Sequence, residues 1–366
     1  MTGRQPEYRV RIGRYWRELA AGNRHGVPDR FMTALLVPPA LLYGMILRVR
    51  AWGYSAGLFT SRRLGRPVIS VGNISVGGTG KTPMTAHIAR YLIGQGKRVA
   101  VLSRGYGGTS RGEARIVSDG TMFFLSAHEA GDEPYLLAKE LPGLMVLIGH
   151  DRYEAGKVAE RDLNPDCFIL DDGFQHLRLR RDLDILLLDG RNPFGNGMTL
   201  PAGLLREPKS AIGRADLIVL TRCAAEGALP NGVDSGAPTL RAGHRLVGVS
   251  PLGGGVRQPF SALHGERVLA FAGIADPSGF FEALSGEGVD LVATRPFPDH
   301  AGYGEAAIEE LCRLRDDVGA TCLVTTAKDA VKLESFMGRL GPVMVAGLEL
   351  ELYDRTVLEQ ALRPFF

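Results

Sequence analysis

The residues with the clearest chemistry lie in a glycine-rich loop in the first quarter of the chain. An apolar, β-branched run leads into this loop, and Lys81 and Thr82 then open a segment with helical apolar spacing. Backbone N–H groups can surround an anion only where no Cβ intrudes, which suits Gly77, Gly78 and Gly80. The Lys81 ammonium would reach the β- and γ-phosphates of a nucleotide, and the Thr82 hydroxyl would ligate Mg²⁺. We therefore expect the phosphates to lie against Ser75, Val76, Gly77, Gly78, Thr79, Gly80, Lys81 and Thr82.

The strict form of this motif has glycine five positions before Gly80, where the chain has Ser75. A glycine-rich turn that binds nothing is the alternative interpretation. Gly-Lys-Thr at the start of a helix, after a buried strand, is a specific combination and favours the phosphate-binding loop.

Two adjacent carboxylates form the second chemical feature. Asp171 and Asp172 end an apolar run that begins at Cys167, and in a phosphate-loop enzyme this is where an Asp holds Mg²⁺ opposite the loop threonine. An apolar strand that ends in Asp can also be a plain turn, but the phosphate loop in the same chain favours the metal site. Gln175 and His176 then place an amide and an imidazole beside this metal site, in roles that spacing does not fix.

Four further polar residues each have two interpretations. Asp132 opens a helical stretch, where it can cap the helix or act chemically. Arg152 lies in a loop and helix start, and can clamp a phosphate or lie on the surface. Asn196 and Arg206 belong to loops stiffened by Gly and Pro, which can position an anion or simply turn the chain.

Buried strands must position these residues. Continuous apolar strands, most of them separated by helical or loop segments, predict a P-loop NTPase-like α/β fold with a doubly wound, largely parallel sheet. Such sheets bind ligands at the carboxyl ends of their strands, where the loops described above lie. The strands that we expect after the phosphate loop cover residues 98–102, 144–148, 167–170, 184–188 and 217–220.

Composition divides the chain into regions. Gly, Pro and Ala dominate residues 223–256 and periodicity fades there, so we expect a linker followed by a second, smaller α/β domain. The second domain should contain strands at 268–271, 291–293, 322–325 and 343–345, and helices that start near Pro277 and Gly304. The expected regions are an N-terminal helical segment (1–66), the phosphate-loop core (67–222), the linker (223–256), the second domain (257–351) and a C-terminal segment that packs back on the core (352–366).

The net charge of +3 hides a strong asymmetry. Residues 1–66 contain 12 Arg and no Lys against three acidic residues, whereas the rest of the chain carries 31 basic and 37 acidic side chains. A basic segment of this kind is typical of contact with an anionic partner, either a membrane or a nucleic acid.

The apolar stretch 31–47 favours the membrane. As a helix it would be about 25 Å long, shorter than the ~30 Å hydrocarbon core, and Pro38 and Pro39 interrupt it. A core helix that covers the sheet is the alternative. We expect instead a pair of helices that lies in the membrane interface without spanning it. In that position the lipid headgroups would be contacted by Arg48, Arg50, Arg62, Arg63 and Arg66. Trp52 and Tyr54 would lie at the boundary of the membrane.

Cysteine usage points to a reducing compartment. Cys167, Cys223, Cys312 and Cys322 show no C-x-x-C spacing, so neither a zinc site nor a disulfide framework is predicted. The first 25 residues are rich in Arg and lack the apolar core of a cleavable signal peptide.

Seven motifs occur in order along the chain, at residues 67–74 with 77–83, 103–106, 131–134, 171–176, 201–203 with 205–208, 297–300 and 325–329. Together they resemble the tetraacyldisaccharide 4'-kinase family, the lipid A 4'-kinases of Gram-negative bacteria, over about residues 35–333. Ser75 agrees with that family, which also lacks glycine at this position. Leu204 stands where the family pattern usually has proline, a departure that should alter loop stiffness rather than chemistry.

The resemblance implies an enzyme that uses ATP and Mg²⁺ to phosphorylate the 4'-hydroxyl of a tetraacylated glucosamine disaccharide 1-phosphate, a step of lipid A biosynthesis. It also implies peripheral or monotopic association with the cytoplasmic face of the inner membrane. We expect a monomer without a nucleic-acid partner. Carried over by position, Asp132 resembles a catalytic base oriented by His300, with Lys81 at the phosphates and Asp171 and Asp172 near Mg²⁺. The expected substrate-binding residues are Arg104, Tyr106, Arg152, Gln175, His176, Asn196 and Arg206.

Two other functions remain open from the sequence. A GTPase that loads metal into a client enzyme would need a guanine-reading motif and a Cys/His metal site, but residues 326–329 have the wrong spacing and no Cys pair exists. A nucleotide-dependent membrane-binding switch would hydrolyse nucleotide slowly and use no small acceptor, which would leave Asp132, His300 and the Arg206 loop unexplained.

Overall fold

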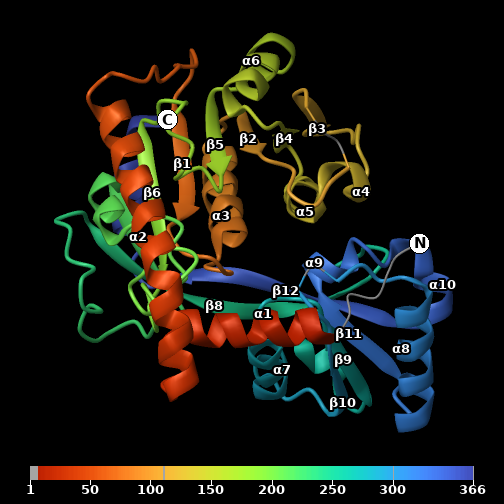
Figure 1. Cartoon of the computed structure of the whole chain (residues 1–366). Coiled ribbons are helices and arrows are strands. Elements are labelled where there is room, and N and C mark those ends of the chain that lie inside the picture. The colour runs from red at the N-terminus through yellow and green to blue at the C-terminus, as the bar shows by residue number, and fades with distance from the viewer. Residues whose placement is uncertain (1–6, 110–111, 300, 366) are drawn as a thin grey trace.

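The computed structural model describes residues 7–109, 112–299 and 301–365 of the chain. Within these residues a single sheet of twelve strands runs through the molecule (Figure 1). Across the sheet, the strands are β10 (Leu291–Pro296), β9 (Val268–Ala272), β11 (Cys322–Thr326), β12 (Val343–Leu352), β8 (Thr239–Pro251), β7 (Leu217–Thr221), β6 (Leu183–Asp189), β1 (Val68–Asn73), β5 (Cys167–Asp171), β2 (Val99–Ser103), β4 (Met145–Ile148) and β3 (Arg115–Asp119).

The strands from β7 to β3 form the first half of the sheet, and in this half only β3 runs antiparallel to its neighbour. β1, β2 and β5 are buried along their whole length, since helices cover both faces. α3 (Lys81–Gly94) and α5 (Asp132–Glu140), which follows the short α4 (Ala127–Ala130), pack on one face, and α6 (Arg152–Asp162) packs on the other. The predicted doubly wound, largely parallel sheet is confirmed.

The second half of the sheet contains β10, β9, β11 and β12, which are mutually parallel. α7 (Pro277–Gly286) packs on one face and α8 (Glu305–Val318) on the other, close to the helix starts expected from the sequence. The short helices α9 (Ala327–Ala330) and α10 (Met337–Leu340) connect β11 to β12.

β8 joins the two halves, and the sequence analysis did not anticipate this strand. Residues 223–256 were expected to be a linker, yet thirteen of them form β8, which pairs parallel with β7 and antiparallel with β12. Leu240 and Ala242 belong to the core of the first half, whereas Leu246 and Val249 belong to that of the second. Arg, Gly and His interrupt the apolar alternation of this segment, so its local propensity does not predict a strand. Pairing with the neighbouring strands β7 and β12 imposes the extended conformation instead.

Two helices precede the sheet, α1 (Glu7–Ala20) and α2 (Val27–Ser55). The expectation that Pro38 and Pro39 interrupt the apolar helix was wrong, because both prolines lie inside the 29-residue α2. Each proline removes only its own backbone donor, and the turns on either side remain bonded. By length and composition α2 is the one helix of the described residues that could cross a membrane, and 11% of its apolar window is buried.

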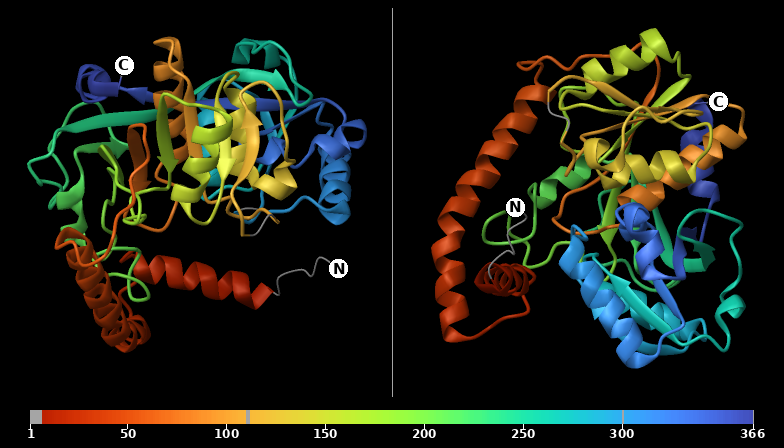
Figure 2. Two further views of the ribbon diagram at one scale, coloured as in Figure 1. Left: turned by 90° about the horizontal axis from the view of Figure 1, so that it is seen from above. Right: turned by 90° about the vertical axis from the view of Figure 1, so that its right-hand side faces the viewer.

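Figure 2 shows α1 and α2 along one side of the molecule, outside the layers that cover the sheet. One face of α2 binds the body: the Thr199 hydroxyl donates to the Ala40 carbonyl at 2.7 Å, and the Tyr43 hydroxyl donates to the Arg206 carbonyl at 3.3 Å. The other face exposes large apolar side chains, namely Leu41, Leu42, Met45, Ile46, Val49 and Trp52.

Four of the arginines that we expected at lipid headgroups bind protein groups, including Arg66, which donates to Asn164 Oδ1 at 3.4 Å. Arg50 donates to the Gln175 carbonyl at 3.1 Å, Arg62 pairs with Glu154, and Arg63 pairs with Asp182. These contacts tie the end of α2 and the following segment to the loop after β5 and to α6.

α11 (Thr356–Leu362) lies at the end of the chain and packs on the first half of the sheet. Leu358 and Leu362 are buried in the same core as Ile69 of β1 and Ile88 of α3. The last turns of the chain therefore complete the core that supports the glycine-rich loop.

Candidate active site

The glycine-rich loop leaves β1 after Asn73 and ends where α3 begins at Lys81. Gly77 and Gly80 have φ angles of 130° and 83°, in the region that favours glycine, whereas Gly78 does not require this freedom. The buried Asn73 amide donates to the Thr79 hydroxyl at 3.0 Å and so holds the loop in a closed curve. The loop therefore has a fixed shape, with the N–H groups of the first turn of α3 free of intrahelical partners.

A second loop braces the first from the side. The Val76 N–H donates to the Leu204 carbonyl at 2.8 Å, and the Arg206 N–H donates to the Ile74 carbonyl at 2.7 Å. Asn196 donates to the Ala202 carbonyl at 2.7 Å and so keeps this second loop folded. Asn196 thus binds within the protein, and Arg206 is carried to the edge of the glycine-rich loop.

Asp172 lies between two cations at the end of β5. Its φ angle of 55° turns the carboxylate toward Arg206, whose Nη1 is 2.8 Å from Oδ2, and Lys81 Nζ is 3.6 Å from Oδ1. Burial acts to raise the pKa of Asp172, but the Lys81 and Arg206 cations outweigh it and hold the pKa below its ordinary value. The Asp172 carboxylate is therefore ionised at neutral pH.

Asp171 has the opposite electrostatics, although it is the adjacent residue. It is 3% exposed, and the buried Thr85 hydroxyl donates to Oδ1 at 3.2 Å. Burial, followed by the negative charges of Glu133 and Asp172, raises the pKa of Asp171 to about 7. The charges of Glu133 and Asp172 therefore act on Asp171 together with that of Lys81, which lowers its pKa.

The described residues contain no group of three or more His, Cys, Asp or Glu side chains that could hold a metal by themselves. The set predicted from the sequence is of another kind, since it combines the Thr82 hydroxyl with the Asp171 and Asp172 carboxylates. A site with two carboxylates and one hydroxyl fits Mg²⁺, which keeps several water or phosphate ligands.

Arg152 and His176 lie on the far side of the carboxylates. Arg152 is 6% exposed, and burial followed by the charge of Arg104 lowers the pKa of its guanidinium. Burial, followed by the charge of Arg152, lowers the pKa of His176 to about 4, so this imidazole is neutral at pH 7. Its buried Nε2 makes no hydrogen bond within the described residues. A buried arginine beside a neutral imidazole with a vacant nitrogen is a suitable site for an anionic or hydroxyl-bearing ligand.

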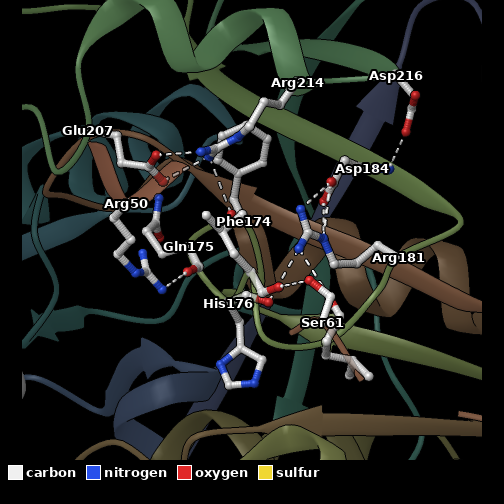
Figure 3. A network of polar contacts seen from close by, with 12 residues as sticks. Arg50, Ser61, Phe174, Gln175, His176, Arg181, Asp184, Glu207, Arg214 and Asp216 are labelled. Carbon is white, nitrogen blue, oxygen red and sulfur yellow. Dashed lines mark hydrogen bonds and ion pairs between the residues drawn. The ribbon is translucent and has the colours of Figure 1, made fainter. Parts of the chain in front are cut away.

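Figure 3 shows how the loop after β5 is held. Arg181 binds Asp184 at 2.7 Å, and Arg214 binds Glu207 at 2.8 Å while lying over the ring of Phe174. Gln175 donates through Nε2 to the Asn73 carbonyl at 2.8 Å. Gln175 therefore supports the glycine-rich loop with its side chain, whereas the His176 ring in the figure points away from this network.

Asp132 begins α5, opposite the second half of the sheet. Its Oδ2 is 2.9 Å from Nζ of Lys332, which follows α9. The adjacent Glu133 has Oε1 3.6 Å from Nζ of Lys328. His300, the expected partner of Asp132, lies outside the described residues, but its neighbour Ala301 accepts a hydrogen bond from Lys332 at 3.0 Å. The acidic start of α5 is thus near the segment that contains His300.

The sequence analysis missed several residues of this site. Thr85 and Lys332 carried no motif signal of their own, and His244 lies in the unpredicted β8. Arg222, which follows β7 and pairs with Asp189 at 3.0 Å, had no such signal either, and a Cβ on Gly78 would lie 3.7 Å from its Nη2. A Cβ on Gly80 would lie 2.8 Å from Nε2 of His244, so this histidine supports the loop closely. Of the predicted residues, Arg104 and Tyr106 are exposed at the rim, Tyr106 to 72%.

Comparisons with known proteins agree on one family. A family model described as tetraacyldisaccharide-1-P 4'-kinase matches residues 32–366. Curated proteins with the name tetraacyldisaccharide 4'-kinase include one from Geobacter sulfurreducens, 56% identical and covering 95% of this chain and 98% of the relative. Another, from Pelobacter propionicus, is 54% identical and covers 96% and 98%. A crystal structure described as the "apo" form of LpxK from Aquifex aeolicus in complex with ATP superposes with a TM-score of 0.76 at 36% identity, covering 92% of this chain and 99% of that one.

Proposed function

Because the chain belongs to the tetraacyldisaccharide 4'-kinase family, we propose that its described site transfers the γ-phosphate of ATP to the 4'-hydroxyl of a tetraacylated disaccharide 1-phosphate. The observation that carries this proposal is the grouping of Lys81, Asp171, Asp172 and Arg206 against one rigid glycine-rich loop. Phosphoryl transfer depends on such fixed charges around the phosphates. The reaction is a step of lipid A biosynthesis.

The glycine-rich loop binds the nucleotide phosphates in this proposal. Backbone N–H groups of residues 75–82 surround them, and Lys81 turns from Asp172 to the β- and γ-phosphates. Thr82, Asp171 and Asp172 would hold Mg²⁺, which would supply positive charge beside the phosphates. Arg206 keeps Asp172 ionised and oriented, since its guanidinium contacts both carboxylate oxygens at 3.1 and 2.8 Å.

Asp132 accepts the proton that the 4'-hydroxyl loses as it attacks. A carboxylate can do this when it faces the γ-phosphate from the acceptor side, and His300 is the residue we propose to orient it. The contacts of α5 with α9 support this role, since they bring Asp132 to the border between the two halves of the sheet (Figure 1). Helix capping alone would not require that position.

The acceptor lipid is bound by Arg152 and His176, with Arg104 and Tyr106 at the rim. The buried Arg152 can bind an anionic or hydroxyl group of the sugar, because water screens a buried cation little. Gln175, Asn196 and Arg206 are better explained as residues that brace the loops, since each binds a protein group there.

Membrane attachment through α1 and α2 completes the proposal. α2 binds the body at Ala40, Tyr43 and Arg50, close to the loops of the active site. If α2 crossed the bilayer, these polar loops would enter hydrocarbon at a cost of several kcal/mol per unsatisfied group. We therefore place α2 along the cytoplasmic interface, with its exposed apolar face toward the acyl chains.

The test is a transfer assay with the purified full chain. Labelled ATP, Mg²⁺ and a tetraacylated disaccharide 1-phosphate are mixed in detergent micelles, and lipid and water phases are separated. We expect label in the lipid phase. With a lipid substrate whose 4'-hydroxyl is replaced by hydrogen, the lipid phase should contain no label. Release of labelled inorganic phosphate alone would instead indicate a nucleotide-dependent switch.

A further inference from the structure

Two lysines of the second half of the sheet contact the start of α5. Lys332 lies 2.9 Å from the Asp132 carboxylate and donates to the Ala301 carbonyl at 3.0 Å. Its side chain is 13% exposed, and that of Asp132 is 21% exposed. Lys332 therefore joins Asp132 to Ala301, and it does so in a place where water screens the ion pair weakly.

Lys328 repeats this arrangement one turn earlier. Its Nζ is 3.6 Å from Glu133 on α5 and 3.6 Å from Asp299, which precedes His300. Two adjacent acidic residues of α5 and two residues of the 299–301 segment are thus bridged by two lysines. Neither lysine belongs to the nucleotide-binding half of the sheet.

A buried carboxylate fixes the turn that presents these lysines. Asp329 is fully buried and accepts hydrogen bonds from the Gly273 N–H at 2.9 Å and the Thr326 hydroxyl at 2.7 Å. The Lys332 N–H donates to the Asp329 carbonyl at 3.0 Å. Lys332 therefore projects from a backbone that is anchored to the ends of β9 and β11, and from there it can fix the position of the Asp132 carboxylate that it contacts.

We propose that Lys332 is a positioning residue for phosphoryl transfer, which holds the Asp132 carboxylate at a fixed place relative to the Ala301 carbonyl. The inference rests on the proposed role of Asp132 as the base. A general base acts only within hydrogen-bond reach of the hydroxyl, and a misplacement of about 1 Å can cost about 10²-fold in rate. Lys332 supplies this placement from across the border between the two halves.

The experiment compares Lys332→Met with Lys332→Arg and with a matched control. Lys332→Met should lower kcat by roughly 10- to 100-fold with the KM for ATP within about twofold of wild type, because the nucleotide contacts are untouched. Lys332→Arg keeps the cation and should recover part of kcat. The control is Lys139→Met, which removes an ion pair between Lys139 of α5 and Glu334 of the second half. This ion pair does not include Asp132, so kcat should remain near wild type.

A double variant separates positioning from general destabilisation. If Lys332 acts through Asp132, Asp132→Asn with Lys332→Met should be no slower than Asp132→Asn alone, since residues that act as a unit are not additive. Wild-type kcat for Lys332→Met, or a further full loss in the double variant, would overturn the inference and leave the kinase assignment intact. Failure of the proposed function gives a different result, because the wild-type chain would then place no label in the lipid.

Discussion

The two sides of the active site are built in different ways. The nucleotide side, which is the loop 74–82 with Asp171 and Asp172, comes from the first half of the sheet and is fixed by backbone shape and buried contacts. The acceptor side, as proposed above, is the start of α5 with Lys328 and Lys332, and ion pairs between the two halves hold it together. Local chain geometry thus determines the nucleotide side, whereas long-range packing determines the acceptor side. Substitutions on the two sides should therefore have different kinetic signatures.

The largest effect is expected on the nucleotide side. Lys81→Ala removes the cation at the β- and γ-phosphates, and kcat for phosphate transfer should fall by about 10³-fold or more. The substitution should leave the melting temperature nearly unchanged, because Lys81 is at a helix start and not in the core. Lys157→Ala on α6, which loses an exposed pair with Glu160, is the control and should keep full activity. Undiminished kcat in folded Lys81→Ala would contradict the assignment of the loop.

On the acceptor side, Asp132→Asn should lower kcat by roughly 10²- to 10⁴-fold while the affinity for ATP holds. An amide cannot accept the hydroxyl proton, and no cap is lost, because Gly131 is the N-cap of α5 and no side chain caps this helix. Steady-state kinetics with varied ATP and varied lipid measure this split. Near-wild-type kcat would leave Asp132 with only a structural ion pair to Lys332 and would remove the distinction between the two sides.

Much of the nucleotide side could be predicted from the sequence, because its residues are close together in the chain. Gly77, Gly80 and Lys81 lie within one loop, and Asp171 ends a strand whose apolar run is unmistakable. The Asp132–Lys332 contact joins residues 200 positions apart, and no periodicity encodes such a pair. β8 was missed for the same physical reason, since its neighbours impose its conformation.

A smaller effect, confined to the lipid substrate, is expected from the exposed face of α2. Replacing Leu42, Ile46 and Val49 by Ser removes three exposed apolar side chains, each worth about 1.5 kcal/mol or more when buried in lipid. The protein should shift toward the soluble fraction, and the KM for micellar lipid should rise more than that for ATP. Vesicle sedimentation and kinetics measure both, and an unchanged distribution would argue against the interface model.

The smallest effect concerns stability and the join between the halves. Burial, followed by the charge of Arg222, lowers the pKa of His244 to about 4, so the folded chain keeps this imidazole neutral. An unfolded histidine takes up its proton near pH 6.5, so His244 destabilises the fold progressively as the pH falls from about 6.5 to 4, by at most about 1.4 kcal/mol per pH unit. His244→Gln should therefore lose less stability than wild type over this range.

Chemical unfolding at several pH values measures that slope. His264→Gln, at an exposed position in the second half, is the matched control and should retain the wild-type slope. If the free energy of unfolding changes with pH equally in wild type and His244→Gln, His244 does not contribute to the pH dependence of stability.

The position of α11 has a consequence for the order in which the molecule is made. The ribosome makes α1 and α2 before the sheet, whereas Leu358 and Leu362, which complete the core around β1 and α3, follow every strand of the described sheet. Until they arrive, the half of the sheet that carries the glycine-rich loop lacks part of its interior. The segment with the most exposed apolar surface is therefore available to a membrane throughout synthesis, before the nucleotide side can take its final form. Attachment can thus precede activity in the life of each molecule.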